Sequence, residues 1–282
     1  MALLALLTGC GPAPMVANAA GRPVALAAFY PYYWAAGRLA GPDVAVGLIT
    51  AAGAEPHDLE LSPRQVAAIG RADLVIYQRH FQPALDDAVR IAPPRAAVDV
   101  RGVLNDPTDD IDPHVWLDPV AMQHIVAAVG DALTQLDPAR TQDIRIRTDA
   151  TIADLQALDG DYADGLRGCA DREIVTNHEA FGHLARRYGL TQVGVTGLNP
   201  DAEPSPRRMA DLVALIRRDR VHTVFTETLA SPRVADTLAR EAGVSTAALD
   251  PLEGLAPNTP GDYLSIMRTN LIALQRGLNC PN

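Results

Sequence analysis

Short apolar stretches alternate with amphipathic segments along most of the chain. Eight of these stretches have the length of a strand: residues 23–29, 44–50, 73–77, 96–100, 173–176, 191–195, 222–227 and 245–249. Helical patterns come between and after them: residues 31–39, a segment from 63, 83–89, 119–136, 139–166, 179–189, 206–218, 232–242 and 263–274. Ser62, Ser205 and Ser231 stand where helix caps are expected, each before a proline. Strands that alternate with helices predict an α/β fold with mostly parallel sheets.

The middle of the chain carries the longest helical pattern. Apolar or small side chains recur there every three or four residues: Ile144, Thr148, Ile152, Leu155, Leu158 and Tyr162. A helix of about 28 residues is roughly 40 Å long, which favours a bridge between two lobes over a surface helix of one domain. We therefore predict two doubly wound lobes, residues 22–137 and 169–282, bridged by one long helix at 138–168.

The first residues predict export. The apolar start leads into Leu7-Thr8-Gly9-Cys10, which resembles the lipobox of bacterial lipoproteins, where the cysteine becomes lipidated. We expect residues 1–21 to be a lipoprotein signal and tether, with Cys10 as the lipidation site. The protein would then be lipid-anchored on the outer side of the cytoplasmic membrane, or periplasmic. A positively charged start is missing, so a start codon upstream is the alternative.

Composition and cysteine content narrow the possible functions. The 282 residues are 48% hydrophobic and 21% charged, as in globular proteins. A net charge of −10 without a basic patch argues against nucleic-acid binding. In an oxidising compartment, Cys169 and Cys280 form an even pair, and we predict a disulfide between them. Two free buried thiols are the alternative.

Candidate metal ligands follow several of the predicted strands. Open α/β sheets place their ligands beyond the carboxyl ends of the strands. Four side chains follow strands or stand in the loop before a helix: His57, His114, His178 and Asp250. Three imidazoles and one carboxylate suit a tetrahedral Zn²⁺ in the cleft between the lobes. Ordinary core or surface histidines are the alternative, because the spacings are long and no short motif such as HExxH is present.

The other histidines are poorer candidates for ligands. They lie within helices, at the start of a strand or in a surface loop: His80, His124, His183 and His222. Glu227 and Glu179 stand near strand ends, and we expect them to orient ligand imidazoles. Trp116 and Phe181 are candidates for excluding water from the site.

Four segments together resemble the solute-binding proteins of ABC importers for zinc and manganese. They are EPHDLELSPRQVAAIGRADLVIY (55–77), DPHVWLDP (112–119), NHEAFGHLARRYGL (177–190) and TETLASPRVADTLAREAGVSTAALDPLEG (226–254). They stand in the family's order and spacing, and the resemblance covers residues 22–275. It implies metal ligands at His57, His114, His178 and Asp250. A histidine at the third of these positions implies zinc, whereas a glutamate there goes with manganese.

The resemblance implies a receptor that delivers Zn²⁺ to an ABC permease in the membrane. No enzymatic activity is expected, because four protein ligands leave no open coordination position for water. We expect a monomer, with a metallochaperone as a further candidate partner. Binding needs neutral imidazoles, so affinity should fall as the pH drops through about 6.5. The alternatives are a manganese or iron receptor of the same family, a metal-dependent adhesin and an exported zinc hydrolase.

Overall fold

Two four-stranded parallel sheets, one in each half of the chain, organise the fold. The computed structural model describes residues 21–104, 112–255 and 260–281. The first sheet has the order β2-β1-β3-β4, with β1 Val24–Ala27, β2 Ala45–Leu48, β3 Leu74–Tyr77 and β4 Ala97–Asp99. The second has the order β6-β5-β7-β8, with β5 Glu173–Thr176, β6 Thr191–Gly194, β7 Thr223–Thr226 and β8 Ser245–Ala248. The eight predicted strands are confirmed, and the two sheets share one topology.

The helices also agree with the hydrophobic pattern, with one addition. The first half contains α1 Tyr30–Ala40, α2 Pro63–Ile69, α3 Pro83–Ile91, α4 Val100–Leu104 and α5 Pro119–Leu136. The second half contains α6 Thr141–Gly165, α7 Gly182–Tyr188, α8 Pro206–Asp219, α9 Arg233–Ala242 and α10 Tyr263–Gly277. Single 3₁₀ turns lie at Val115–Leu117 and Pro138–Arg140. The sequence pattern missed α4, because the apolar stretch before it continues into the helix.

Two of the three predicted helix caps are present. Ser62 accepts a hydrogen bond from the backbone N–H of Gln65, and Ser205 accepts one from that of Arg208. The prediction for Ser231 is wrong. Helix α9 begins one residue later than expected, and its N-cap is Pro232, which offers no side-chain hydrogen bond.

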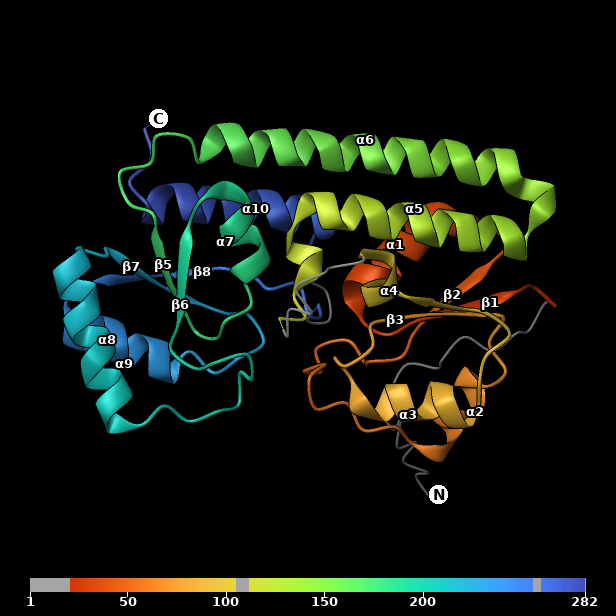
Figure 1. Cartoon of the computed structure of the whole chain (residues 1–282), viewed down its shortest axis with the longest axis horizontal. Coiled ribbons are helices and arrows are strands. Elements are labelled where there is room, and N and C mark those ends of the chain that lie inside the picture. The colour runs from red at the N-terminus through yellow and green to blue at the C-terminus, as the bar shows by residue number, and fades with distance from the viewer. Residues whose placement is uncertain (1–20, 105–111, 256–259, 282) are drawn as a thin grey trace, which may run out of the picture.

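Helix α6 joins the two lobes along one side of the molecule (Figure 1). It packs against α1 and α5 of the first half and against α10 of the second. Arg147, near its start, donates a hydrogen bond of 2.6 Å to the carbonyl of Leu39 at the end of α1. The Tyr162 hydroxyl, near its end, donates one of 2.7 Å to the carbonyl of Met267 in α10. The exact boundaries of the lobes stay a prediction.

The lobes share one apolar core. Buried side chains of the first sheet, of α5 and of α6 are continuous with Leu249, Tyr263 and Met267 of the second half. A separate, smaller core lies between the second sheet and helices α8 and α9. A large apolar interface resists relative motion of two lobes, so this seam is stiff. Within the described residues, no helix is both long and apolar enough to cross a membrane.

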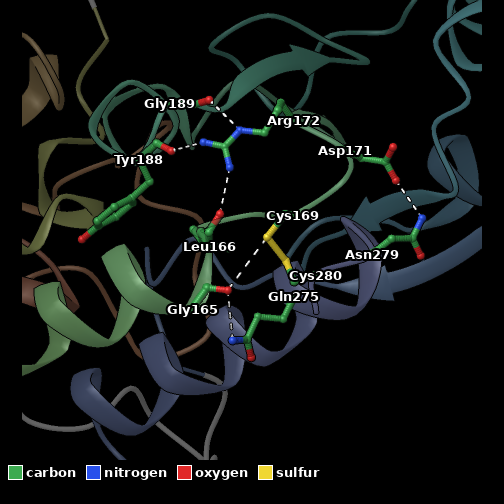
Figure 2. The surroundings of a disulfide bond; sticks show 10 residues. All are labelled: Gly165, Leu166, Cys169, Asp171, Arg172, Tyr188, Gly189, Gln275, Asn279 and Cys280. Atoms are coloured by element: carbon green, nitrogen blue, oxygen red, sulfur yellow. Dashed lines mark hydrogen bonds between the residues drawn. A yellow bond between two sulfur atoms is a disulfide. The ribbon is translucent and has the colours of Figure 1, made fainter. Parts of the chain in front are cut away.

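The structure joins Cys169 to Cys280 in a disulfide, as predicted, with a Cα–Cα distance of 3.8 Å. Figure 2 shows this bond beside the turn that connects α6 to β5. The Arg172 guanidinium fixes the turn, because it donates hydrogen bonds to the carbonyls of Leu166, Tyr188 and Gly189. The tail of the chain is thereby attached to the start of the second sheet. Cys10, the predicted lipidation site, lies outside the described residues.

The disulfide predicts a measurable loss of stability when it is removed. It closes a loop of 111 residues, and in the loop-entropy model such a closure stabilises by about 4–5 kcal/mol. We expect the Cys169→Ala, Cys280→Ala double variant to lose most of this free energy of unfolding in urea titrations. A loss below about 1 kcal/mol would show that the tail contributes little to the folded state.

Candidate metal centre

Three imidazoles and one carboxylate meet at the seam between the lobes. One ligand atom from each of His57, His114, His178 and Glu253 lies within 4.8 Å of the others. The Oε1 atom of Glu253 is 3.1, 3.0 and 3.2 Å from the Nε2 atoms of His57, His114 and His178. The Nε2 atom of His114 is 3.4 Å from that of His57 and 3.3 Å from that of His178. Ligands of a tetrahedral Zn²⁺ at ~2.0–2.2 Å are roughly 3.3 Å apart, so these distances fit one ion.

The first ligand candidate, His57, lies in the loop after β2. Its backbone N–H donates to Glu55 Oε1 at 3.1 Å, and its ring contacts Phe81 edge-on, with centroids 4.8 Å apart. The buried Gln82 amide donates to the hydroxyl of Thr50 and to the carbonyl of Pro56, both at 3.0 Å. These contacts hold the loop in place. The His57 side chain is 13% exposed, whereas those of the other two histidines are fully buried.

The second ligand candidate, His114, precedes the 3₁₀ turn at Val115–Leu117. Its backbone N–H and its ring Nδ1 both lie at hydrogen-bond distance from Asp112 Oδ1, at 3.0 and 2.8 Å. An Nδ1–H that donates to this carboxylate leaves the Nε2 lone pair free for a metal. Trp116, buried beside the ring, donates its indole N–H to the carbonyl of Pro251 at 2.8 Å. The turn is thus attached to the loop that carries Glu253.

The third ligand candidate, His178, lies two residues after the end of β5. Its backbone N–H donates to Glu227 Oε1 at 3.0 Å, and its Nδ1 is 2.6 Å from Glu227 Oε2. The Glu227 carboxylate, directly after β7, thus holds this ring by its Nδ1, and its role in orienting a metal ligand stays a prediction. Phe181, predicted to exclude water, is fully buried at the start of α7.

Glu179, the other carboxylate predicted to orient an imidazole, lines a pocket at the surface. Its side chain packs over Gly194, where a Cβ would be 2.5 Å from the Glu179 Cγ. Together with Glu203 and Arg208 it lines a surface pocket of about 350 Å³. The carboxylate that holds the second imidazole is Asp112, which enters the sequence prediction only as the first residue of the segment 112–119. Its position two residues before His114 was the available signal.

The structure corrects one predicted ligand position, Asp250. Its carboxylate turns back on its own loop and accepts the backbone N–H of Leu252 at 2.8 Å. The Asn270 amide of α10 pairs with both backbone groups of Asp250 and fixes this orientation. Leu252 then adopts a left-handed conformation with φ of 54°, and the next residue, Glu253, reaches the imidazoles. The strand-end rule located the loop that carries Glu253, but it did not select the carboxylate that faces the imidazoles.

Charge pairing dominates the electrostatics of this cluster. Burial disfavours a charge on His178, but hydrogen bonds to Glu227 and Glu253 raise its pKa to about 10. Burial likewise opposes a charge on His114, and hydrogen bonds to Asp112 and Glu253 nevertheless raise its pKa. Burial alone would raise the pKa of Glu253, but its hydrogen bonds to the three imidazoles hold that pKa well below its usual range. Without a metal, His178 therefore stays protonated at neutral pH, and the charged form of His114 is favoured.

A pair of α/β lobes with such a cluster at their seam defines a two-lobed solute-binding protein with a cation site. The chain belongs to the family of the zinc-uptake complex component A, periplasmic (ZnuA), whose model matches residues 26–277. It is similar to the zinc-binding lipoprotein AdcA of Streptococcus pneumoniae, at 36% identity over 271 residues, which are 88% of this chain and 54% of that protein. The chain thus spans about half the length of AdcA.

Other relatives match over most of their length. The high-affinity zinc uptake system protein ZnuA of Bacillus subtilis is 33% identical over 273 residues, covering 89% of this chain and 86% of that protein. The Zn(II)-bound ZnuA-like domain of S. pneumoniae AdcA superposes with a TM-score of 0.80 at 34% identity, over 92% of this chain and all of that one. The laminin-binding protein Lmb of Streptococcus agalactiae, a bifunctional protein with adhesin and metal transporting activity, gives 0.82 at 30% identity, with the same coverage.

The raised pKa of His178 predicts how the metal-free protein responds to pH. The folded-state value of about 10 lies above the unfolded value of about 6.5, so the stabilisation is complete below pH 6.5 and is lost as the pH rises towards 10. Between pH 6 and pH 9, we expect the wild type to lose more than about 1 kcal/mol of unfolding free energy relative to His178→Gln. Urea denaturation in the presence of a chelator measures this difference, and parallel pH curves would contradict it.

Proposed function

We propose that this chain is an extracytoplasmic zinc-binding protein that captures one Zn²⁺ between its lobes and delivers it to an ABC-type permease. One observation carries the proposal: Glu253 Oε1 lies 3.0–3.2 Å from the Nε2 atoms of three imidazoles. Five of the six distances between the four atoms are 3.0–3.4 Å, close to the spacing in a tetrahedral coordination shell. Glu253, His57, His114 and His178 are the proposed ligands, and the ion is cargo.

The donor set favours zinc over manganese as cargo. Three imidazole nitrogens and one carboxylate oxygen suit Zn²⁺, whereas carboxylate, carbonyl and water oxygens suit Mn²⁺. The names of relatives support this choice, since AdcA is called zinc-binding and the B. subtilis relative a zinc uptake protein. Four protein ligands in a buried site leave no position for a metal-bound water, so we propose no catalytic activity.

Capture and release can occur only where the site reaches solvent. His57 is the one partly exposed ligand, and its loop includes the exposed residues 51–53. Because the lobes share an apolar core, we propose that this loop moves while the lobes stay together. An imidazolium must lose a proton before its nitrogen can bind the ion, so binding at neutral pH releases a proton from His178.

The cellular setting is proposed from the sequence and from the family. A lipidated Cys10 would hold the protein at the outer side of the cytoplasmic membrane, beside its permease. We propose that the protein acts as a monomer there, and that a metallochaperone is a candidate for loading the site. A second candidate function is adhesion, because the similar Lmb is described as an adhesin as well as a metal transporter. Laminin binding that persists in a His178→Ala variant without zinc would favour it.

Metal analysis tests the proposed cargo directly. We expect the purified protein, offered equimolar Zn²⁺, Mn²⁺ and Fe²⁺, to retain one Zn²⁺ per chain. The His178→Ala variant should lose it on dialysis, because a ligand and the partner of Glu227 are both removed. Elemental analysis after dialysis gives the stoichiometry. Retention of Mn²⁺ in preference to Zn²⁺ would overturn the assignment of the cargo.

A matched pair of amide variants tests the fourth ligand. Glu253→Gln replaces an anionic ligand by a neutral amide, and we expect zinc affinity to fall by about 10- to 100-fold, or about 1.4–2.7 kcal/mol. Asp250→Asn keeps an oxygen that can accept the Leu252 N–H, so affinity should stay within about threefold of the wild type. Competition with a chromophoric chelator measures both constants. A larger loss in Asp250→Asn than in Glu253→Gln would restore Asp250 as the ligand.

A further inference from the structure

A chain of hydrogen bonds crosses from the second lobe to the residue that holds His114. It starts on α7, where His183 Nδ1 is 3.1 Å from an Arg186 Nη2, and where His183 Nε2 is 3.1 Å from the carbonyl oxygen of Asp112. Asp112 belongs to the first half of the chain and binds both the backbone N–H and the ring Nδ1 of His114. The two lobes are thus joined by hydrogen bonds immediately beside a proposed ligand.

The chemistry of the partners fixes the direction of these hydrogen bonds. An arginine guanidinium can only donate, so Arg186 donates to His183 Nδ1, and that nitrogen carries a lone pair. A neutral imidazole with a lone pair on Nδ1 carries its proton on Nε2. His183 therefore donates from Nε2 to the carbonyl of Asp112. A side chain that only accepts, or that has no polar atom, cannot replace it.

The packing around Asp112 also favours a close contact between this residue and α7. The side chains of His183 and Asp112 are 12% and 9% exposed, so water competes little for this contact. A Cβ at Gly182, the first residue of α7, would lie 2.5 Å from Asp112 Oδ2. A glycine at this position lets the first turn of the helix approach the carboxylate closely. Helix α7 also starts only four residues after His178. One short segment therefore supplies the proposed ligand His178 and the residue, His183, that contacts the partner of His114.

We propose that His183 is a positioning residue for metal binding, which holds Asp112 and through it the His114 ring. The inference rests on the proposed function. Fixed by the second lobe, Asp112 keeps the Nδ1–H of His114 engaged and its Nε2 directed at Glu253. Loss of an outer hydrogen-bond partner of a metal-binding histidine typically costs 10- to 100-fold in metal affinity. Asp112 lies between His183 and His114, so His183 is one hydrogen bond further from the metal. Its loss should therefore reduce metal affinity by an amount at the lower end of that range.

The test compares zinc dissociation from two variants at position 183 with dissociation from the wild type. His183→Phe keeps a ring and removes the donor, and we expect zinc to dissociate about tenfold faster into an excess of chelator. His183→Gln keeps an amide donor and should stay within about threefold of the wild type. The same exchange at an exposed histidine of α5, His124→Phe, is the control and should change nothing.

A spectroscopic readout separates positioning from simple stabilisation. In Co²⁺-loaded protein, the paramagnetically shifted Nδ1–H signal of His114 should broaden in His183→Phe, because the proton exchanges faster with water when Asp112 moves. A Gly182→Ala variant displaces the Asp112 carboxylate and should broaden the same signal. If His183→Phe fails to fold, as judged by circular dichroism, Gly182→Ala and His183→Gln carry the test.

The experiments distinguish a failure of the positioning role from a failure of the proposed function. Dissociation and Nδ1–H signals in His183→Phe or Gly182→Ala that equal those of a zinc-binding wild type would overturn the positioning role alone. Wild-type protein that binds no zinc would overturn the proposed function instead. A faster dissociation in His183→Gln equal to that in His183→Phe would also count against the inference, because it would show that the donor does not matter.

Discussion

The structure depends on one buried contact, in which a single carboxylate oxygen of Glu253 faces three imidazole nitrogens. A carboxylate removed from water is strongly destabilising unless opposite charges and hydrogen bonds compensate it. Here the compensation comes from both lobes, since His57 and His114 belong to the first half and His178 to the second. Two further carboxylates, Asp112 and Glu227, hold the outer nitrogens of two rings. The interlobe seam is therefore assembled around charge as well as around apolar surface.

The apolar surface at the same seam determines how such a site can exchange its ion. Tyr263 of α10 donates its hydroxyl to the carbonyl of Trp116 at 2.6 Å, and the Trp116 indole donates to Pro251. Both contacts are buried and link the turn after His114 to the second lobe. Opening the lobes would break these hydrogen bonds and expose continuous core. Movement of the loop with His57 costs less, because it breaks a few hydrogen bonds, such as those of Gln82 to Thr50 and Pro56, and leaves the shared core buried.

The sequence predicted the fold better than it predicted the site. Hydrophobic periodicity is local, so it located all eight strands and the long helix. The rule that ligands follow strands then pointed to His57 and His178, which the structure places in one His/Glu cluster. The choice between Asp250 and Glu253 depends on the left-handed backbone at Leu252 and on Asn270, twenty residues away in sequence from Asp250. Likewise, the backbone after His178 turns Glu179 away from the rings. Both outcomes follow from tertiary contacts, which no local pattern encodes.

The balance of charge explains why the ligands can be assembled before an ion arrives. Asp112, Glu227 and Glu253, the carboxylates hydrogen-bonded to the rings, together carry three negative charges. In the metal-free protein the pKa values of both His114 and His178 are raised, which favours their charged forms, and the value of about 10 for His178 keeps that ring protonated at neutral pH. A divalent cation that displaced one proton from each of these two rings would leave the net charge of the cluster unchanged. The buried site can therefore keep one geometry with and without the ion. The difference in free energy between the metal-free and the metal-bound protein then depends on pH, and no rearrangement of the lobes is needed.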